Sequence, residues 1–600
     1  MSENDLSRSV TTSSPLQAEL VRDFGQLQAL AEDWNRLWRL TKGRQIFHHF
    51  GWACAWWSAY GGSYALYTPV IRMQGEVVAI LPLVMQGRTL LFLGHNTSDY
   101  NNLMCVPSHG AEALAAACEL LLEHFSEWDE CRLHNVAEGS SLVESIGRLP
   151  GALRRRCCRG PDMLCHALDL REGKEEKLAR LLGKYSTRRV LKALQARGSL
   201  EFRHLAKRAT IEEHLPVFAR QHIARRAMAG DRSGFLDPRW MRFYLNLLEE
   251  FDADRPIRFS VLELNGQPVA YHFGFELDGR LIYFTPTFDV DLWDRAPGAA
   301  LMYHLLDYSR TSDVTELDLT WGNEAYKLRI ADLARRNHRY HLFSRTAVGR
   351  LRQAMFEARE LLRNLPPVYN LLKGIATRFT EMHARVQESL RTRGAVAFLA
   401  RLLRVVVRRI LYARTEVLLY ALDASSLVRS DSGAGSVEIR QATLSDLAVA
   451  SPGNPDFLTA ARLTMFRKRL QRGDEVYTAY RDGDLAHVAW LRTTNRIAPT
   501  AEIQSDWHFD LPDLGFVIFD CWTAEPFRRQ GIYRAVLGHL ISLCLEKRRM
   551  VWIYTVEANT ASRRGIESTG FKLHSRVRET TVLGRFRKVR VEAVCRSRGQ

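Results

Sequence analysis

Alternating and continuous apolar patterns predict short strands, separated by turns and helices, along much of the chain. The apolar runs 259–264 and 269–275 flank Asn265-Gly266, and Asn-Gly between two such runs is a strong hairpin signal. Helical periodicity then predicts a helix over 298–309, and a short apolar run predicts a strand over 316–319. This order of hairpin, helix and strand indicates a mixed α/β unit.

An earlier stretch of the chain shows a similar outline, although the sequence itself shows no repeat. The runs 70–72 and 77–83 flank Gly75 and predict a hairpin, and residues 90–94 predict another strand. A helix with an apolar stripe is expected over 111–125. The first part of the chain is therefore expected to hold two units of similar outline.

Near the C-terminus, a strand runs into a glycine-containing loop that opens a helix. Residues 516–523 predict the strand, and 532–547 predict an amphipathic helix with one apolar side. Unpaired amides at such a helix start, together with the helix dipole, favour a bound anion. Arg528 and Arg529 add cationic donors suited to a pyrophosphate, and Gly531 lets the backbone approach closely.

The segment Arg528-x-x-Gly531-x-Tyr533 resembles the Q/R-x-x-G-x-G/A pyrophosphate loop of the GNAT acetyltransferase superfamily. Residues 551–556 resemble the strand that follows it, and Gly570-Phe571 resembles the turn into the last strands. The resemblance covers most of 437–595. It implies acetyl-CoA or another acyl-CoA as co-substrate, with the pantetheine arm paired to the backbone of residues 521–523. The implied CoA-binding residues are Cys521, Trp522, Thr523, Arg528, Arg529, Gln530, Gly531, Ile532, Tyr533, Asn559 and Ser562.

Two positions depart from the GNAT pattern. Tyr533 occupies the last small position of the loop, and Ile566 lies where many relatives carry a tyrosine that protonates the leaving thiolate. The chemistry needs a base for the incoming amine or hydroxyl and an acid for the thiolate. Glu525, Cys521 and Tyr554 are the alternative donors. Without such an acid, the module would bind acyl-CoA as a scaffold without turnover.

Residues 16–345 resemble the FemAB-like proteins, in the branch of CelD acetyltransferases of cellulose biosynthesis. The resemblance rests on motifs in both halves, which include Ser98-Asp99-Tyr100, Pro297-Gly298, Asp318 and Gly322-Asn323-Glu324-x-Tyr326-Lys327. It implies two GNAT-like folds packed as one unit that transfers an acyl or aminoacyl group to an amine or a hydroxyl. The usual phosphate loop is absent from this part of the sequence, so the motifs do not identify its donor.

Polar residues in these two units are the candidates for catalysis. Asp99 and Tyr100 lie in a polar loop after a strand, where functional residues are often found. Asp318, Glu324 and Lys327 lie at the end of a strand and can bind a substrate, and the alternative is a salt-bridged surface turn.

Two further features have both a functional and a structural interpretation. His222 is a candidate base, although a lone helical histidine is more often structural. Trp52, Trp56 and Trp57 either stack on a sugar or form the core face of a helix.

The segment 346–423 is rich in arginine and poor in acidic residues. A helix over 395–420 would carry Arg401, Arg404 and Arg408 on one face. Such a helix suits an anionic membrane surface or a glycan-synthesis complex, and it suits packing against neighbouring domains equally well. The formal net charge of +17 indicates an anionic partner or reflects an arginine-rich proteome.

The cysteines and the N-terminal sequence indicate the cellular compartment of the protein. The 10 cysteines are scattered without CxxC pairs, which is typical of buried thiols in a reducing compartment, and no metal site is expected. Residues 1–14 are polar and lack a signal peptide, and no apolar run reaches the roughly 20 residues that span a bilayer. We therefore expect a cytoplasmic protein, with peripheral attachment at the inner membrane face if the basic helix binds lipid.

These observations predict the fold class α/β (α+β), with tandem GNAT-like mixed-sheet domains and a helical connector. The expected function is an acyl-CoA-dependent N- or O-acyltransferase, in exopolysaccharide or cell-envelope biosynthesis by resemblance. The alternatives are an aminoacyl-tRNA-dependent transferase, with tRNA as its nucleic-acid partner, and the acyl-CoA-binding scaffold. The acceptor stays open among a sugar, an amine and a peptide. The expected segments are a disordered N-terminus (1–15), two GNAT-like halves (16–170 and 171–345), the connector (346–423), a linker (424–436) and a GNAT domain (437–595).

Overall fold

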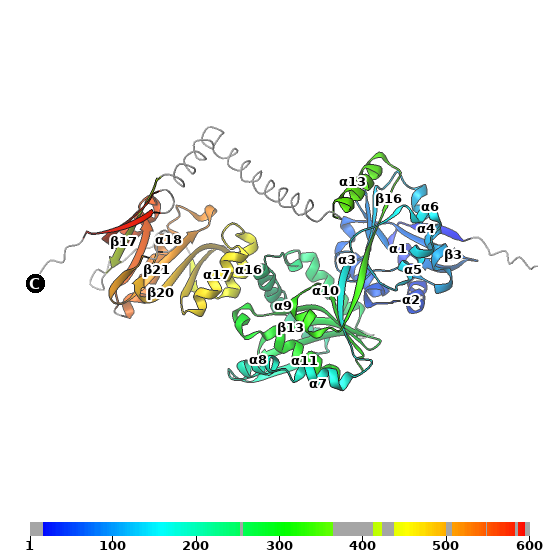
Figure 1. Ribbon diagram of the computed structural model, residues 1–600, viewed down its shortest axis with the longest axis horizontal. Helices are drawn as coiled ribbons and strands as arrows, with labels where there is room; N and C mark the ends of the chain where they lie inside the picture. The colour runs from blue at the N-terminus through cyan, green and yellow to red at the C-terminus, as the bar shows by residue number, and fades with distance from the viewer. Residues whose placement is uncertain are drawn as a thin grey trace, which may run out of the picture. The chain divides into compact units, whose positions relative to one another are not determined.

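The computed structural model describes residues 16–252, 256–363, 412–422, 437–499, 507–547, 549–582 and 586–594. These residues form two compact units, one built almost entirely from residues up to 363 and the other from residues 412 onward. Each unit contains a large mixed sheet with helices packed on it (Figure 1). The predicted mixed α/β fold class is therefore confirmed. The predicted disordered N-terminus, the linker and most of the connector lie outside the described residues.

The first unit joins its two halves through one continuous sheet of twelve strands. Seven neighbouring strands at one end of this sheet are, in order, β11 (Leu200–Leu205), β12 (Ile257–Leu264), β13 (Gln267–Leu277), β14 (Arg280–Phe288), β15 (Glu316–Trp321), β10 (Met163–Asp169) and β16 (Leu333–Phe343). The sheet continues with β8 (Glu130–Ala137), β6 (Thr89–Phe92), β5 (Leu83–Gln86) and β2 (Ala65–Leu66), and β9 (Cys157–Arg159) pairs with β16. Because the long strand β16 pairs with both β10 and β8, it ties the two halves together (Figure 1).

A second, four-stranded sheet completes the first half, in the order β1 (Gln17–Val21), β3 (Thr68–Met73), β4 (Glu76–Ile80) and β7 (Met104–Cys105). The helices of the first half are α1 (Phe24–Ala29), α2 (Ala31–Leu40), α3 (Phe50–Tyr60), α4 (Gly110–Glu123), α5 (Ser141–Arg148) and α6 (Gly151–Arg154). Those of the second half are α7 (Lys174–Leu182), α8 (Tyr185–Gln195), α9 (Arg208–Ala229), α10 (Pro238–Glu250), α11 (Pro297–Thr311) and α12 (Ala325–Ile330), and α13 (Ala347–Arg363) follows β16.

Local sequence signals explain the main elements of the second half. Asn265 and Gly266 both have positive φ angles, 54° and 74°, which is the geometry that an Asn-Gly hairpin turn between β12 and β13 requires. The predicted hairpin is therefore confirmed. Helix α11 begins with Pro297 at its first position, where the missing amide costs nothing and the fixed φ favours the helix.

The second unit is an eight-stranded sheet. Its order is β18 (Glu438–Gln441), β19 (Glu475–Arg481), β20 (Asp484–Ile497), β21 (Phe509–Thr523), β22 (Val551–Val556), β17 (Tyr412–Leu422), β23 (Lys572–Val582) and β24 (Phe586–Ala593). Its helices are α16 (Leu444–Ala450), α17 (Ala460–Gln471), α18 (Ile532–Glu546) and α19 (Thr560–Ser568).

Strand β17 corrects one prediction. The sequence predicted a helix as far as residue 420 and a domain that begins at 437, yet Tyr412–Leu422 is a strand inside the C-terminal sheet. It is hydrogen-bonded to β22 on one side and to β23 on the other. Val417, Leu418 and Leu419 are all buried, because a central strand is covered on both faces. Such a continuous apolar run cannot be distinguished from a buried helix by periodicity.

The structure also reveals the repeat that the sequence does not show. The order β11-β12-β13-β14-β15-β10-β16 in the first unit equals the order β18-β19-β20-β21-β22-β17-β23 in the second. In each copy, an antiparallel meander leads through a helix to one parallel pairing: β14 with β15, and β21 with β22. In the first half of the first unit, β6 likewise pairs in parallel with β8.

These parallel pairings are short and open at one end. The register of β14 with β15 covers three residue pairs and ends at Ile282 and Asp318, although both strands continue. The register of β21 with β22 also covers three pairs and ends at Ile518 and Ile553. Beyond these points the two strands separate, so their backbone groups are available to a ligand or to inserted side chains.

Large apolar clusters hold the crossover helices against these sheets. Leu301 and Leu305 of α11 pack in one core with Leu317 of β15, and Val536 and Leu540 of α18 pack in another. Full burial of each such side chain contributes about 1.5–3 kcal/mol.

Tryptophans of the first half also belong to a core. Trp52 and Trp56 are completely buried, and Trp57 stacks on Phe24 at 5.2 Å between ring centroids. These rings are therefore part of the packing of α3 rather than a sugar-stacking surface.

Candidate active site

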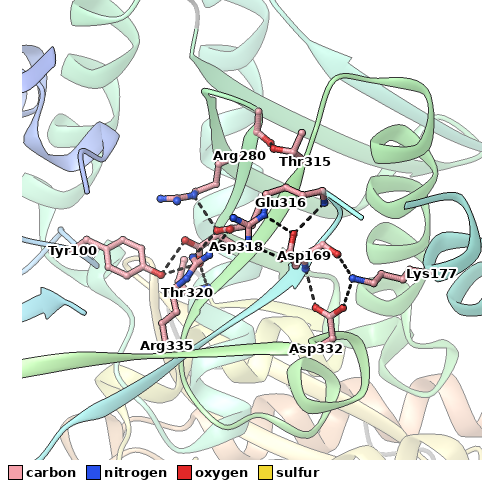
Figure 2. A network of polar contacts seen from close by, with 12 residues as sticks. Tyr100, Asp169, Lys177, Arg280, Thr315, Glu316, Asp318, Thr320, Asp332 and Arg335 are labelled. Carbon is pink, nitrogen blue, oxygen red and sulfur yellow. Dashed lines mark hydrogen bonds and ion pairs between the residues drawn. The ribbon is translucent and has the colours of Figure 1, made fainter. Parts of the chain in front are cut away.

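The opening between β14 and β15 holds a row of buried polar side chains. Glu316, Asp318 and Thr320 alternate along β15 with apolar residues, and all three are buried. Their exposed fractions are 5%, 1% and 4%. Figure 2 shows this row with the charged residues around it. Asp318 lies where β14 and β15 separate.

Glu316 is neutralised by its neighbours. Arg335 contacts both oxygens of this carboxylate, at 2.7 and 2.5 Å, and Arg280 lies 3.0 Å from one of them (Figure 2). These cations hold the pKa of Glu316 below its usual range, despite the opposing effect of burial. We interpret Glu316 as a structural member of the site, because a buried carboxylate needs such pairing.

Asp318 has different partners. Tyr100, from the loop after β6, donates its hydroxyl to the two carboxyl oxygens at 2.8 and 3.0 Å, and the Thr320 amide donates at 2.9 Å. Burial raises the pKa of Asp318, and burial beside this carboxyl raises the pKa of Tyr100 well above its usual range. The direct hydrogen-bond donors to Asp318 are a hydroxyl and an amide, and the positive charge of the nearby Arg280 opposes the upward shift in its pKa.

Thr320 adopts an uncommon backbone conformation beside this carboxyl. Its φ is +58°, in the left-handed region that a β-branched residue rarely occupies. The conformation directs the Thr320 amide at Asp318. Strain of this kind costs about 1–3 kcal/mol and tends to occur at functional sites.

Asp99 approaches the same region from the other half of the unit. Its Oδ1 accepts a hydrogen bond of 2.8 Å from the indole of Trp321, and its carbonyl accepts one of 2.9 Å from Asn337. Burial raises the pKa of Asp99 to about 7, although Trp321 and Lys327 oppose the shift. Trp321 is 47% exposed. A partly exposed carboxyl that titrates near neutrality is suited to proton transfer.

Lys327 is the remaining charged residue of this site. Its ammonium donates to the Trp321 carbonyl and lies 3.3 Å from Glu324. The Lys327 side chain is 5% exposed, whereas that of Glu324 is 54% exposed. The salt-bridged turn considered above therefore exists, but its lysine is buried and faces the site. A buried lysine is uncommon without a structural or chemical role.

The structure thus brings together two groups of residues that are far apart in the sequence: Asp99 and Tyr100, and Asp318, Glu324 and Lys327. His222 is held differently: its Nδ1 lies 2.8 Å from the Ser233 hydroxyl, and its ring packs against Phe235. This contact links α9 to the segment before α10, and the catalytic role of His222 stays a prediction.

Three residues of this site escaped the sequence analysis. Thr320, Trp321 and Asn337 were not candidates, and the alternation in Glu-Leu-Asp-Leu-Thr-Trp over 316–321 is the signal that could have indicated the first two. Asn337 carries no local signal, because its role comes from the pairing of β16 with β8.

The second unit offers a different arrangement at the equivalent opening. Gly531 has a φ of +79° and precedes α18 without a side-chain cap, so the first amides of the helix point outward. Arg528 and Arg529 are exposed beside it, and Gln530 accepts a 2.6 Å hydrogen bond from Arg481. This loop has the features of a pyrophosphate cradle. Glu525 is exposed in the short 3-10 turn Glu525–Phe527.

Several of the predicted CoA-binding residues of this unit are engaged in contacts within the protein. Asn559 caps α19 by accepting from the Ser562 amide at 3.1 Å, and the Ser562 hydroxyl lies 3.2 Å from the hydroxyl of Tyr533. The end of β21 bulges at Asp520 and Cys521, and Trp522 stacks on Phe457 at 4.1 Å. Ile566 is completely buried.

The first unit lacks the cradle at the corresponding helix. Ala296, with a φ of +50°, takes the place of Gly531, and Pro297 removes one of the amides. The preceding turn carries Asp289, Asp291 and Asp294, with Arg295 as its one arginine, where the C-terminal loop has Arg528 and Arg529. The copy in the first unit therefore has the buried polar residues around Asp318, and the copy in the second unit has the loop that is suited to a pyrophosphate.

Within the described ranges, no three or more histidine, cysteine, aspartate or glutamate side chains are grouped so as to hold a metal ion. No helix in the part of the chain that the structure describes combines the length and apolar character needed to cross a membrane.

Family models match both copies of the repeat. Residues 183–328 match the model described as "Acetyltransferase (GNAT) domain", and residues 455–571 match that described as "Acetyltransferase (GNAT) family". The chain therefore carries two GNAT-type acetyltransferase domains in tandem, and the first matched range contains Asp318 and Lys327. A search of the curated proteins found no match.

Solved structures with some similarity to this chain include the following three. FemX is 10% identical, over 57% of this chain and 100% of its own, with a TM-score of 0.40. A tandem GNAT protein from the clavulanic acid biosynthesis pathway is 14% identical, over 56% and 100%, with a TM-score of 0.35. L-PGS from Bacillus licheniformis is 11% identical, over 60% and 97%, with a TM-score of 0.35.

Proposed function

We propose that the first unit transfers an acyl group to an amine or hydroxyl acceptor at the site formed by Asp99 and Asp318. The observation that carries the proposal is the position of two carboxyls with raised pKa values where β14 and β15 separate. This opening lies within the range that matches a GNAT model. The finer statements below, on donor, acceptor and setting, belong to the same proposal.

Asp99 is the proposed general base. Its carboxylate takes the proton of the acceptor N–H or O–H as the acceptor lone pair attacks the carbonyl carbon of the donor. The bond from that carbon to the leaving sulfur or oxygen then breaks, and the leaving atom takes up the proton. Trp321, exposed and bonded to Asp99, is positioned to stack on the acceptor.

Tyr100 and Lys327 are proposed to position this base. The 2.8 Å hydrogen bond from Tyr100 to Asp318 fixes the loop that carries Asp99 against β15. Lys327 holds the Trp321 carbonyl, and its charge opposes the upward shift in the pKa of Asp99. These contacts keep Asp99 in place without neutralising it as an ion pair would.

Acyl-CoA is the donor that the GNAT match favours. A specific observation favours an aminoacyl-tRNA as the second candidate: the helix that would receive the CoA pyrophosphate begins with Pro297, after a turn of net negative charge that holds three aspartates and Arg295. Negative charge and a missing amide disfavour a pyrophosphate at that helix. An aminoacyl ester needs no such anchor at this point.

The test compares donors on the full-length chain. Acetyl-CoA, longer acyl-CoAs and charged tRNA are each supplied with sugar, amine and peptide acceptors, and acceptor modification is measured by mass spectrometry. Asp99→Asn and Asp318→Asn should each lower the rate by about 100-fold or more, in line with loss of a general base or its support. Asp307→Asn, on the exposed side of α11 beside Arg310, is the matched control. Unchanged rates in both site variants would contradict the proposal.

A setting in exopolysaccharide or cell-envelope biosynthesis is part of the proposal and rests on the sequence resemblance. It is supported if sugar or envelope-peptide acceptors are modified in this panel while unrelated amines are not. A peripheral association with a membrane is likewise proposed for the basic segment 364–411, which lies outside the described residues. Binding to vesicles that contain anionic lipid tests it.

A further inference from the structure

The C-terminal GNAT domain differs from its family pattern at Tyr533, and the structure shows where this side chain lies. Its ring packs on Gly565 of α19 so closely that a Cβ on this glycine would lie 2.7 Å from a ring atom. Its hydroxyl lies 3.2 Å from the Ser562 hydroxyl, one turn earlier in the same helix. The side chain therefore reaches from the first turn of α18 to α19.

The other neighbours of the ring belong to the opposite side of the opening. His487 of β20 lies 5.6 Å away between ring centroids, and it is tied to Thr523 at the end of β21 by a 2.8 Å contact. The thiol of Cys521 is near enough to influence the pKa of Tyr533, which burial also raises. The ring thus has β20 and β21 on one side and α19, which follows β22, on the other.

This position is the one that a pantetheine arm needs. By the family resemblance, the arm pairs with the backbone of residues 521–523, beyond the point where β21 and β22 separate at Ile518 and Ile553. A phenol ring packed between these strand ends and α19 occupies that path. The loop of Arg528, Arg529 and Gly531 stays exposed, so the cradle fits a pyrophosphate while the path beyond it does not fit the arm.

We propose that Tyr533 closes the CoA cleft of the C-terminal domain, and that this domain does not take up acyl-CoA while the ring lies between α18 and α19. Acyl transfer then belongs to the first unit, and the C-terminal domain keeps the GNAT fold without the co-substrate. Alanine in place of Tyr533 restores the small residue of the family loop and should open the cleft.

The experiment measures CoA binding to the full-length chain by calorimetry, with CoA itself as the probe. Tyr533→Ala should bind CoA at least 10-fold more tightly than the natural chain, because the path is vacated. Adding Arg528→Glu and Arg529→Glu to Tyr533→Ala should abolish the gain, which assigns it to this cleft rather than to the first unit. Tyr533→Phe keeps the ring and should behave like the natural chain.

Two outcomes would overturn the inference. In the first, the natural chain binds CoA, and the substitutions Arg528→Glu and Arg529→Glu abolish that binding. The C-terminal domain would then accept CoA with Tyr533 present. The second is a folded Tyr533→Ala protein, judged by circular dichroism and melting temperature, that gains no affinity. If Tyr533→Ala does not fold, Tyr533→Ser serves instead, because it also removes the ring and should give a gain of the same sign.

Discussion

Tyr100 donates its hydroxyl to Asp318 at 2.8 Å across a sequence separation of 218 residues. Tyr100 comes from the loop after β6 in the first half, and Asp318 comes from β15 in the second half. The contact joins the two halves at the point where β14 and β15 separate. The polar site therefore lies between the two halves of the first unit, and each half contributes residues to it.

Tyr100→Phe should destabilise the first unit and impair transfer. The change removes a buried hydrogen bond to a carboxyl group, which is expected to cost about 1–3 kcal/mol of unfolding free energy. Urea unfolding measures the loss, and kcat/KM measures the effect on transfer. Tyr303→Phe on α11, a partly exposed tyrosine, is the control. Equal stability of the two variants would show that the contact contributes little.

The ionisation of Asp99 should lower the free energy of unfolding of the first unit as pH rises toward neutrality. Its folded pKa of about 7 lies above the value of 3.8 expected without burial, so between these values the folded state holds a proton that the unfolded state has released. Its contribution to stability is therefore full below pH 4 and is lost as pH rises to about 7. Asp99→Asn should remove this component, measured as the difference between urea midpoints at pH 5 and pH 8.

The same titration predicts the pH profile of transfer. As a general base, Asp99 acts in its ionised form, so kcat/KM should rise with pH through about 7. Asp307→Asn should keep this inflection. An identical inflection in Asp99→Asn, whatever its rate, would assign the titration to another group.

Thr320→Gly should lower the melting temperature less than the same substitution at another buried threonine, Thr287. Glycine removes a buried side chain, but it also relieves the strain of a φ of +58°, worth about 1–3 kcal/mol. Thr287→Gly on β14 removes a side chain that is equally buried, from a residue without a positive φ. Thermal unfolding of both variants should place Thr320→Gly at the higher melting temperature. The opposite order would mean that Thr320 is not strained.

The C-terminal domain should need strand β17 in order to fold. A fragment of residues 437–600 lacks the strand between β22 and β23, so it exposes two strand edges and loses the buried Val417 and Leu419. A fragment that begins at residue 406 retains the strand. Circular dichroism and cooperative thermal melting should show a folded domain for the longer fragment alone. A cooperative transition in 437–600 would show that β17 is dispensable.

The outcome of the sequence analysis differs between the fold and the site. The hairpin around Asn265-Gly266 and helix α11 could be predicted because turn geometry and helical periodicity are local properties. Strand β17 could not, because a strand buried on both faces loses the alternation that identifies strands. Its position between β22 and β23 depends on contacts with residues more than a hundred positions away.

The candidate site shows the same division. Asp99, Tyr100, Asp318, Glu324 and Lys327 were selected from the polar character of loops and strand ends. Their proximity could not be derived, because it follows from the pairing of β15 with β10 and of β16 with β8. Thr320 was missed since a threonine on a strand is ordinary in sequence and unusual only in its backbone angle.

By itself the sequence determined the types of elements, the GNAT resemblance at both ends of the chain, and the glycine and arginines of the loop at 528–531, because these depend on neighbouring residues. Only the tertiary structure decided the identical strand order of the two copies, the contact of Tyr100 with Asp318, and the place of the Tyr533 ring. The last case is the clearest. The sequence shows that Tyr533 occupies a position where the family pattern has a small residue. Whether its ring closes a cleft depends on the residue that packs against it, which is Gly565 on another helix.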